Sequence, residues 1–83
     1  MLKIGDYVRV KKEFNVYGTL VHKANEIGQI VAIEKGRFFR KRYVVNYNPR
    51  GDISSGKNYE FQGYWYRNEI KKISKKEAFI EAL

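Results

Sequence analysis

Cationic and aromatic side chains are concentrated in the stretch GRFFRKRYVVNY, residues 36–47, which has four cations and four aromatic residues in twelve positions. Cations pair with phosphate groups and aromatic rings stack on bases, so this combination is typical of proteins that bind single-stranded nucleic acid. The alternative is a β-hairpin whose basic turn is only a solvated face, as many runs of charge are. The candidate nucleic-acid-binding residues of this stretch are Arg37, Phe38, Phe39, Arg40, Lys41 and Arg42.

The side chains of the two adjacent phenylalanines are expected to differ in the face to which they point. If the alternation of a β-strand continues through the stretch, Phe38 and Phe39 point to opposite faces. One ring is then expected in the core and the other on the surface, where it is available to stack on a base.

A second aromatic cluster, YWYR, occupies residues 64–67. Strand alternation sends Trp65 to one face and both Tyr64 and Tyr66 to the other, and we expect Trp65 to be largely structural because a small core needs its few large rings. Tyr66 and Arg67 are further candidates for binding nucleic acid. Tyrosine and tryptophan are also enriched in protein–protein contacts. The alternative, protein-binding set is therefore Tyr7, Tyr17, Tyr64, Trp65 and Tyr66.

The chain is strongly basic, with 17 Lys and Arg against nine Asp and Glu, and a formal net charge of +8. Such a surplus favours anionic partners, of which nucleic acid is the commonest. In the first strand Val8 and Val10 alternate with Arg9 and Lys11, so the valines are expected on the buried face and the two cations on the outer face. Arg9 and Lys11 complete the candidate nucleic-acid-binding set. The lysines at positions 71, 72, 75 and 76 surround the last strand, which often neighbours the first in small barrels. Whether these cations form one surface or serve only solubility is left open by their spacing.

No pattern typical of catalysis is found. The sequence has no cysteine, and its one histidine, His22, is interpreted as a surface or loop residue. Glu60 and Glu69 have no partner spaced for acid–base chemistry, and no glycine-rich phosphate-binding motif is present. We therefore predict a protein that is not an enzyme and that uses no cofactor and no metal.

The N-terminal sequence MLKIGDYVRV lacks the apolar stretch of a signal peptide, and no apolar run approaches the length of a membrane span. These features predict a cytoplasmic protein without membrane contact.

Turn-forming residues recur at short intervals, which favours an all-β fold in this single 83-residue domain. Residues 12–27 show no sustained period and are predicted to be a long loop, and residues 48–58 are rich in turn-forming residues and are predicted to be another. The predicted strands are Tyr7–Lys11, Gly28–Glu34, Arg40–Tyr47, Tyr59–Arg67 and Ile70–Ile73.

In the last ten residues the spacing of apolar side chains changes from that of a strand to that of a helix. Ser74 and Glu77 match a capping box, and apolar residues then follow at helical spacing. A helix this short is marginal alone, so Phe79, Ile80 and Leu83 are expected to dock on the sheet or on a partner.

The elements KIGDYVRV, IGQIVAI, RYVVNY and YWYRNEIKKI, taken together, resemble a small SH3-like barrel. The resemblance covers about residues 3–73 and implies a five-stranded barrel over residues 1–73, with a helical tail at 74–83. Within that superfamily the spacing is similar to the YorP-like proteins, small SH3-like proteins of bacteria and their phages with no assigned activity. The basic RFFRKR segment and the capped tail depart from that pattern. The resemblance implies a phage or prophage origin and carries over no catalytic residues.

The charge, the aromatic residues and the resemblance lead us to expect one of two functions. The first is a small, non-enzymatic protein, encoded by a phage, that contacts DNA or RNA through Arg, Lys and aromatic side chains with little sequence specificity. The second is a protein-interaction module that binds and modulates a host enzyme or defence protein. An SH3-like fold alone does not choose between them.

Overall fold

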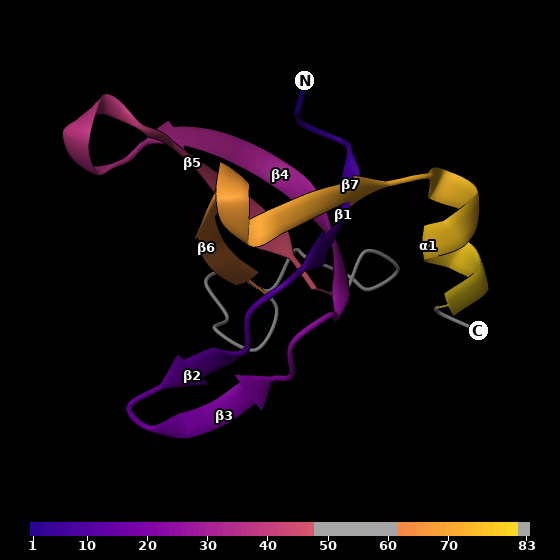
Figure 1. Ribbon diagram of the computed structural model, residues 1–83, viewed down its shortest axis with the longest axis horizontal. Helices are drawn as coiled ribbons and strands as arrows, with labels where there is room; N and C mark the ends of the chain where they lie inside the picture. Colours follow the sequence, from indigo (N-terminus) through magenta and orange to yellow (C-terminus); the bar gives the residue numbers. More distant parts are fainter. Residues whose placement is uncertain (48–61, 82–83) are drawn as a thin grey trace.

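The computed structural model describes residues 1–47 and 62–81, which form a small, mostly β structure with one short C-terminal helix (Figure 1). The strands are β1 (Tyr7–Val10), β2 (Phe14–Val16), β3 (Thr19–His22), β4 (Ile27–Lys35), β5 (Lys41–Asn46), β6 (Gln62–Tyr66) and β7 (Ile70–Ile73). Two 3₁₀ turns, η1 (Arg37–Phe39) and η2 (Arg67–Glu69), precede β5 and β7, and α1 (Lys75–Glu81) ends the described chain. The mostly β prediction and the short C-terminal helix are confirmed. The predicted loop at 48–58 lies outside the described residues.

Five strands form one antiparallel sheet in the order β6-β5-β4-β1-β7. The long strand β4 pairs with β1 through its first residues and with β5 over most of its length, and its register with β5 shifts between Ile30 and Ala32. In the described part of the chain, the outer strands β6 and β7 are not paired with each other, and the sheet is open. We predicted that the first and last strands are neighbours, and this is confirmed because β1 pairs with β7.

The prediction of a loop over residues 12–27 is wrong. This segment contains the hairpin of β2 and β3, joined by Tyr17 and Gly18. Both turn residues have positive φ, 51° and 80°, as a type I′ turn requires. The strands have only three and four residues, too short for a visible alternation. His22, expected on the surface or in a loop, lies at the end of β3 and stacks on Tyr47 with ring centroids 3.8 Å apart.

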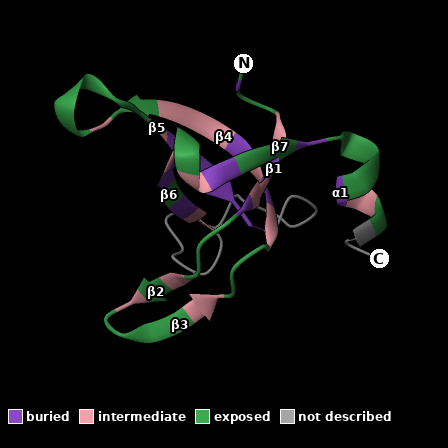
Figure 2. Cartoon of the chain, in the orientation of Figure 1, coloured by how far each residue is buried: buried purple, intermediate pink, exposed green. Residues whose placement is uncertain are grey.

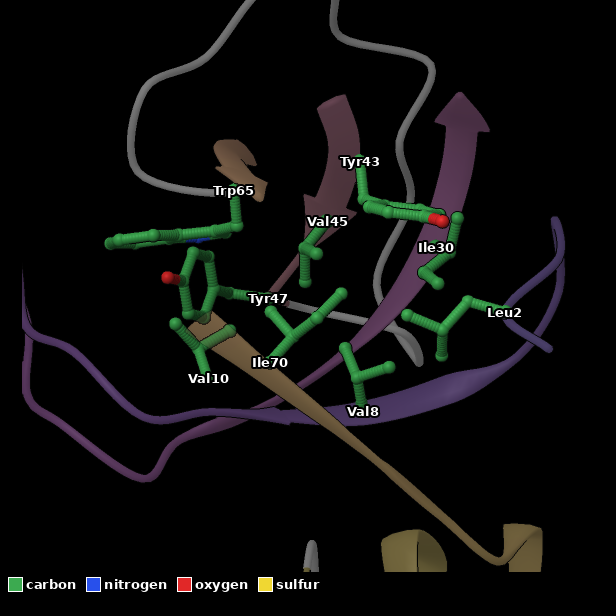
Figure 3. Packing of buried hydrophobic residues seen from close by; sticks show 9 residues of the cluster. All are labelled: Leu2, Val8, Val10, Ile30, Tyr43, Val45, Tyr47, Trp65 and Ile70. Carbon is green, nitrogen blue, oxygen red and sulfur yellow. The ribbon is translucent and has the colours of Figure 1, made fainter. Parts of the chain in front are cut away.

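The core lies on one face of the sheet, where β1 contributes Val8 and Val10 by the predicted alternation. Trp65 of β6 is 7% exposed and joins them, while its neighbour Tyr64 is 45% exposed. Figure 3 shows the rings of Trp65 and Tyr47 packed beside the aliphatic side chains. The complete cluster is Leu2, Val8, Val10, Ile30, Tyr43, Val45, Tyr47, Trp65 and Ile70.

Gly28 marks a close approach of β4 to β5. A Cβ at this position would overlap Cγ1 of Val45 and lie 2.8 Å from the backbone oxygen of Asn46. Both groups are completely buried, so neither has room to move, and only glycine fits.

The C-terminal helix docks on the sheet. The Ser74 hydroxyl accepts a hydrogen bond from the Glu77 amide at 3.0 Å, as the capping pattern predicts. Ala78 is buried, and the Phe79 ring lies 5.5 Å from that of Tyr7 in β1. Ile80, predicted to dock, is 57% exposed, because successive helical residues point in different directions. Leu83 lies outside the described residues. Among those described, no helix is long and apolar enough to cross a membrane.

Candidate nucleic-acid interface

The hairpin tip, residues 36–40, is the turn between β4 and β5 and projects away from the sheet (Figure 1). The last strand pair below it is Lys35 with Lys41. The Gly36 amide donates to the Arg40 carbonyl at 2.6 Å, and the Arg40 amide donates to the Arg37 carbonyl at 3.1 Å. These bonds close a compact turn at the end of the hairpin.

Both phenylalanines of the hairpin tip are exposed, Phe38 by 88% and Phe39 by 84% (Figure 2). The expectation that one ring would be in the core is wrong, because the chain leaves the strand after Lys35 and alternation no longer applies. Both residues have positive φ, 56° and 61°. This left-handed conformation costs a non-glycine residue about 1–2 kcal/mol, and η1 has no buried residue to offset that cost.

Tyr66 supports the hairpin tip from β6. Its hydroxyl accepts a hydrogen bond from the Arg37 amide at 3.2 Å, and the Arg40 guanidinium lies 4.3 Å above its ring. A Cβ on Gly36 would lie 2.9 Å from the Tyr66 ring, so the turn and the ring are in close contact. Tyr66 is half-buried and acts here as a support, with one ring face covered by Arg40.

Beside the hairpin tip lies a shallow hollow of about 530 Å³, which we call the basic hollow. It is lined by Lys11, Arg40, Arg67, Asn68, Ile70, Lys71 and Lys72. Five of these seven residues are cationic and none is acidic. The hollow therefore offers a concave positive surface of the kind that attracts phosphate groups.

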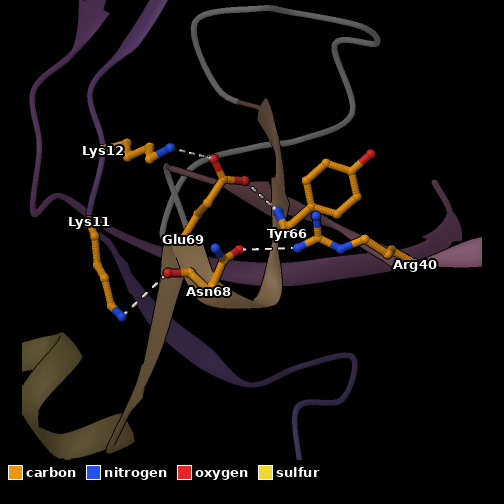
Figure 4. A network of polar contacts seen from close by, with 6 residues as sticks. All are labelled: Lys11, Lys12, Arg40, Tyr66, Asn68 and Glu69. Carbon is orange, nitrogen blue, oxygen red and sulfur yellow. Dashed lines mark hydrogen bonds and ion pairs between the residues drawn. The ribbon is translucent and has the colours of Figure 1, made fainter. Parts of the chain in front are cut away.

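Asn68 of η2 organises the basic hollow (Figure 4). Its side-chain Oδ1 accepts a hydrogen bond from Arg40 at 3.3 Å, and its backbone carbonyl lies 3.5 Å from the Lys11 ammonium. The adjacent Glu69 carboxylate accepts from the Tyr66 amide at 2.7 Å and pairs with Lys12 at 3.3 Å. Because Glu69 is engaged in this way and is not among the lining residues, it leaves the positive charge of the hollow in place.

The cations of the basic hollow differ in whether a carboxylate of the protein already pairs with them. Lys72 lies 3.5 Å from the Asp6 carboxylate. Arg67 and Lys71 are exposed and form no ion pair within residues 1–47 and 62–81. Arg40 belongs both to the hollow and to the hairpin tip, and so joins the two into one surface.

Two predicted cations do not line the basic hollow and are paired with carboxylates. Arg9 donates to the Asn25 carbonyl at 2.8 Å and lies 3.6 Å from Glu77 of α1. Arg42 pairs with Glu34 at 2.7 Å, and that hydrogen bond raises the pKa of Arg42. Lys41 is exposed at the start of β5, directly below the hairpin tip.

The predicted protein-binding tyrosines do not form one groove. Tyr7 contacts Phe79 under α1, whereas Tyr17 is fully exposed at the turn between β2 and β3. Tyr64 lies under the Arg42 guanidinium at 4.8 Å. Trp65 belongs to the core, and Tyr66 supports the hairpin tip. Tyr7 and Tyr17 therefore lie in parts of the fold separate from β6, and within β6 Trp65 points to the opposite face from Tyr64 and Tyr66.

Sequence reasoning did not identify Asn68 as a site residue. The signal was its place between Arg67 and the final strand, where a 3₁₀ turn presents both its amide and its carbonyl. In the part of the chain that the structure describes, no three His, Cys, Asp or Glu side chains gather where a metal ion could be held.

Comparison with protein-family models, with curated proteins and with solved structures finds no match to this chain.

Proposed function

We propose that this protein binds nucleic acid without catalysing a reaction, and that the basic hollow receives backbone phosphates. The observation that carries the proposal is a concave surface lined by five cations and no carboxylate. Phosphate contacts carry affinity without reading sequence, so binding is expected to show little sequence specificity. Both DNA and RNA have the required backbone.

We further propose that the fold is an SH3-like barrel. Three features support this: the β4-β5-β6 meander, the pairing of β1 with both β4 and β7, and the 3₁₀ turn η2 that leads an aromatic strand into the last one. The resemblance to YorP-like proteins supports a phage or prophage origin, and a phage-encoded protein of this kind would act in the host cytoplasm.

A second candidate function is a protein-interaction module for a host enzyme or defence protein. The observation in its favour is the turn between β2 and β3, where Tyr17 is fully exposed and Leu20 is 46% exposed. Exposed aromatic and aliphatic side chains at a defined turn are suited to a protein contact.

The dependence of binding on salt tests the first proposal. If three to five cations of the hollow contact phosphates, the affinity of the protein for a duplex should fall with a slope of about −3 to −4.5 in log K against log salt. Fluorescence anisotropy of a labelled oligonucleotide, titrated at several salt concentrations, measures this slope. Absence of binding at low salt, or an affinity that does not change with salt, would contradict the proposal. Capture of a host protein after nuclease treatment of the lysate would favour the second function.

A further inference from the structure

We infer that the hairpin tip is a base-stacking element and that the nucleic acid bound by this protein is single-stranded. The inference rests on the proposed function and specifies its ligand. Phosphates of the strand lie in the basic hollow, and the bases stack on the rings of Phe38 and Phe39.

The first step is that folding buries neither of these two rings. They are 88% and 84% exposed, and their backbone is left-handed, a conformation that phenylalanine rarely adopts. Strain of this kind concentrates at binding sites, where the surrounding structure maintains it. Folding leaves the two rings exposed to water, and a ligand that covers them would bury them.

The second step is that the hairpin tip is held in place. Its base is fixed by two backbone hydrogen bonds within the turn and by the bond from the Arg37 amide to the Tyr66 hydroxyl. Arg40 is held between the Tyr66 ring and the Asn68 side chain. A preorganised element binds more tightly, because less conformational freedom is lost when the ligand arrives.

The third step concerns the faces that the rings offer. The Lys35 ammonium lies 4.5 Å from the centre of the Phe39 ring and covers one of its faces. The Phe38 ring has no aromatic or cationic partner among the described residues. The tip therefore presents one open ring and one ring with a single open face, to which flat bases are suited.

The fourth step is the charge around the rings. The sequence from Lys35 to Lys41, KGRFFRK, contains four cations and no acidic residue. An apolar protein partner would have to desolvate these cations, whereas a nucleic acid neutralises them with phosphate. The charge therefore favours a polyanion with flat apolar faces.

The fifth step separates single strands from duplexes. In a duplex each base is covered by its neighbours, and a side chain that inserts between them must unstack a step at a cost of a few kcal/mol. In a single strand the base faces are accessible without this cost. Because Arg40 joins the hairpin tip to the basic hollow, a flexible strand can place its bases on the rings and its backbone in the hollow.

Phenylalanines among cations would also suit the surface of an anionic membrane. The basic hollow is indented and lies beside the hairpin tip, which favours a narrow polyanionic strand over a flat lipid surface. Membrane binding is therefore an outcome that the experiment must distinguish.

The experiment compares a labelled oligothymidine of about 12 nucleotides, within the range of about 4–16 that small single-strand-binding domains cover, with a duplex of the same length. The variant is the double change Phe38→Ala and Phe39→Ala. The matched control is Tyr17→Ala, which removes another exposed ring from a hairpin turn with positive φ. A second control, Phe38→Tyr with Phe39→Tyr, retains both rings. Circular dichroism verifies that each variant is folded.

We expect the wild-type protein to prefer the single strand. The double alanine variant should bind it at least about 25-fold more weakly, from at least about fivefold per stacked ring, with the salt slope unchanged. Tyr17→Ala and the double tyrosine variant should bind within about threefold of wild type, on the same stacking argument. Vesicles of phosphatidylcholine with phosphatidylserine should not be bound.

Equal affinity of wild type and the double alanine variant for the single strand would overturn this inference and leave the proposed function standing. A preference for the duplex, or vesicle binding that is lost with the rings while oligonucleotide binding is kept, would overturn it as well. Failure of the wild-type protein to bind either nucleic acid would overturn the proposed function itself.

Discussion

Replacing Trp65 with alanine should lower the free energy of unfolding by about 3–5 kcal/mol. Trp65 is 7% exposed and packs beside Tyr47 at one end of the core cluster (Figure 3). The Phe14 ring meets it edge-on at 6.0 Å. The substitution removes the largest side chain from the cluster and leaves a cavity that the short strands cannot close. A domain of 83 residues has a total stability of about 4–12 kcal/mol, so the variant should be close to unfolding.

Urea denaturation measures this effect, and the adjacent residue provides the control. Tyr64 lies on the same strand but is 45% exposed, so Tyr64→Ala should cost no more than about 1 kcal/mol. Similar losses in the two variants would contradict the assignment of Trp65 to the core and of Tyr64 to the surface. The same comparison tests whether the Trp65 side chain is available at the surface to contact a protein partner.

The triple change Lys11→Gln, Arg67→Gln and Lys71→Gln should abolish most of the binding to nucleic acid. These three cations come from separate segments and line the basic hollow without a carboxylate partner among the described residues. If each contacts one phosphate, the salt slope on a single strand should fall in magnitude by about 2, and the affinity at low salt by at least roughly a hundredfold. Anisotropy titrations at several salt concentrations measure both quantities.

A second triple variant separates the site from the net charge. Lys3→Gln, Lys23→Gln and Lys76→Gln remove the same three charges from exposed positions that do not line the basic hollow. This control should keep affinity within about tenfold of wild type, because only long-range attraction is reduced. If the two triple variants lose affinity equally, the protein attracts polyanions by its overall charge and the hollow is not a site.

The elements with a local signal could be predicted from the sequence. Alternation placed Val8 and Val10 in the core, and it separated Trp65 from Tyr64. The hydroxyl of Ser74 and its spacing to Glu77 predicted the start of α1. In each case neighbouring residues determine the outcome, so no knowledge of distant contacts is needed.

The hairpin tip could not be predicted in the same way. Strand alternation implied that one of the two phenylalanines would be buried, but the turn after Lys35 exposes both. No sequence rule assigns left-handed backbone to two successive phenylalanines, because glycine and asparagine are the residues that usually adopt it. The ring of Tyr66, 29 positions from Arg37, helps to fix this turn.

The basic hollow depends on contacts between segments far apart in the chain. Lys11 and Asn68 are 57 positions apart, and Arg40 and Asn68 are 28 apart. The sequence left open whether cations of the first and last strands share a surface, and it gave no sign that Arg40 would join them. It also included Arg9 and Arg42 in the candidate binding set, and in the structure nearby carboxylates pair with both.

Mapping the bound oligonucleotide on the protein by ¹H–¹⁵N NMR tests the central claim most directly. When the single-stranded probe is added, the largest shift changes should occur at the backbone amides of Phe38, Phe39 and Arg40 and in the segment from Arg67 to Lys71. Changes confined to the turn at Tyr17 or to α1, or no change at saturating probe, would contradict the claim that the hairpin tip and the basic hollow form one nucleic-acid-binding surface.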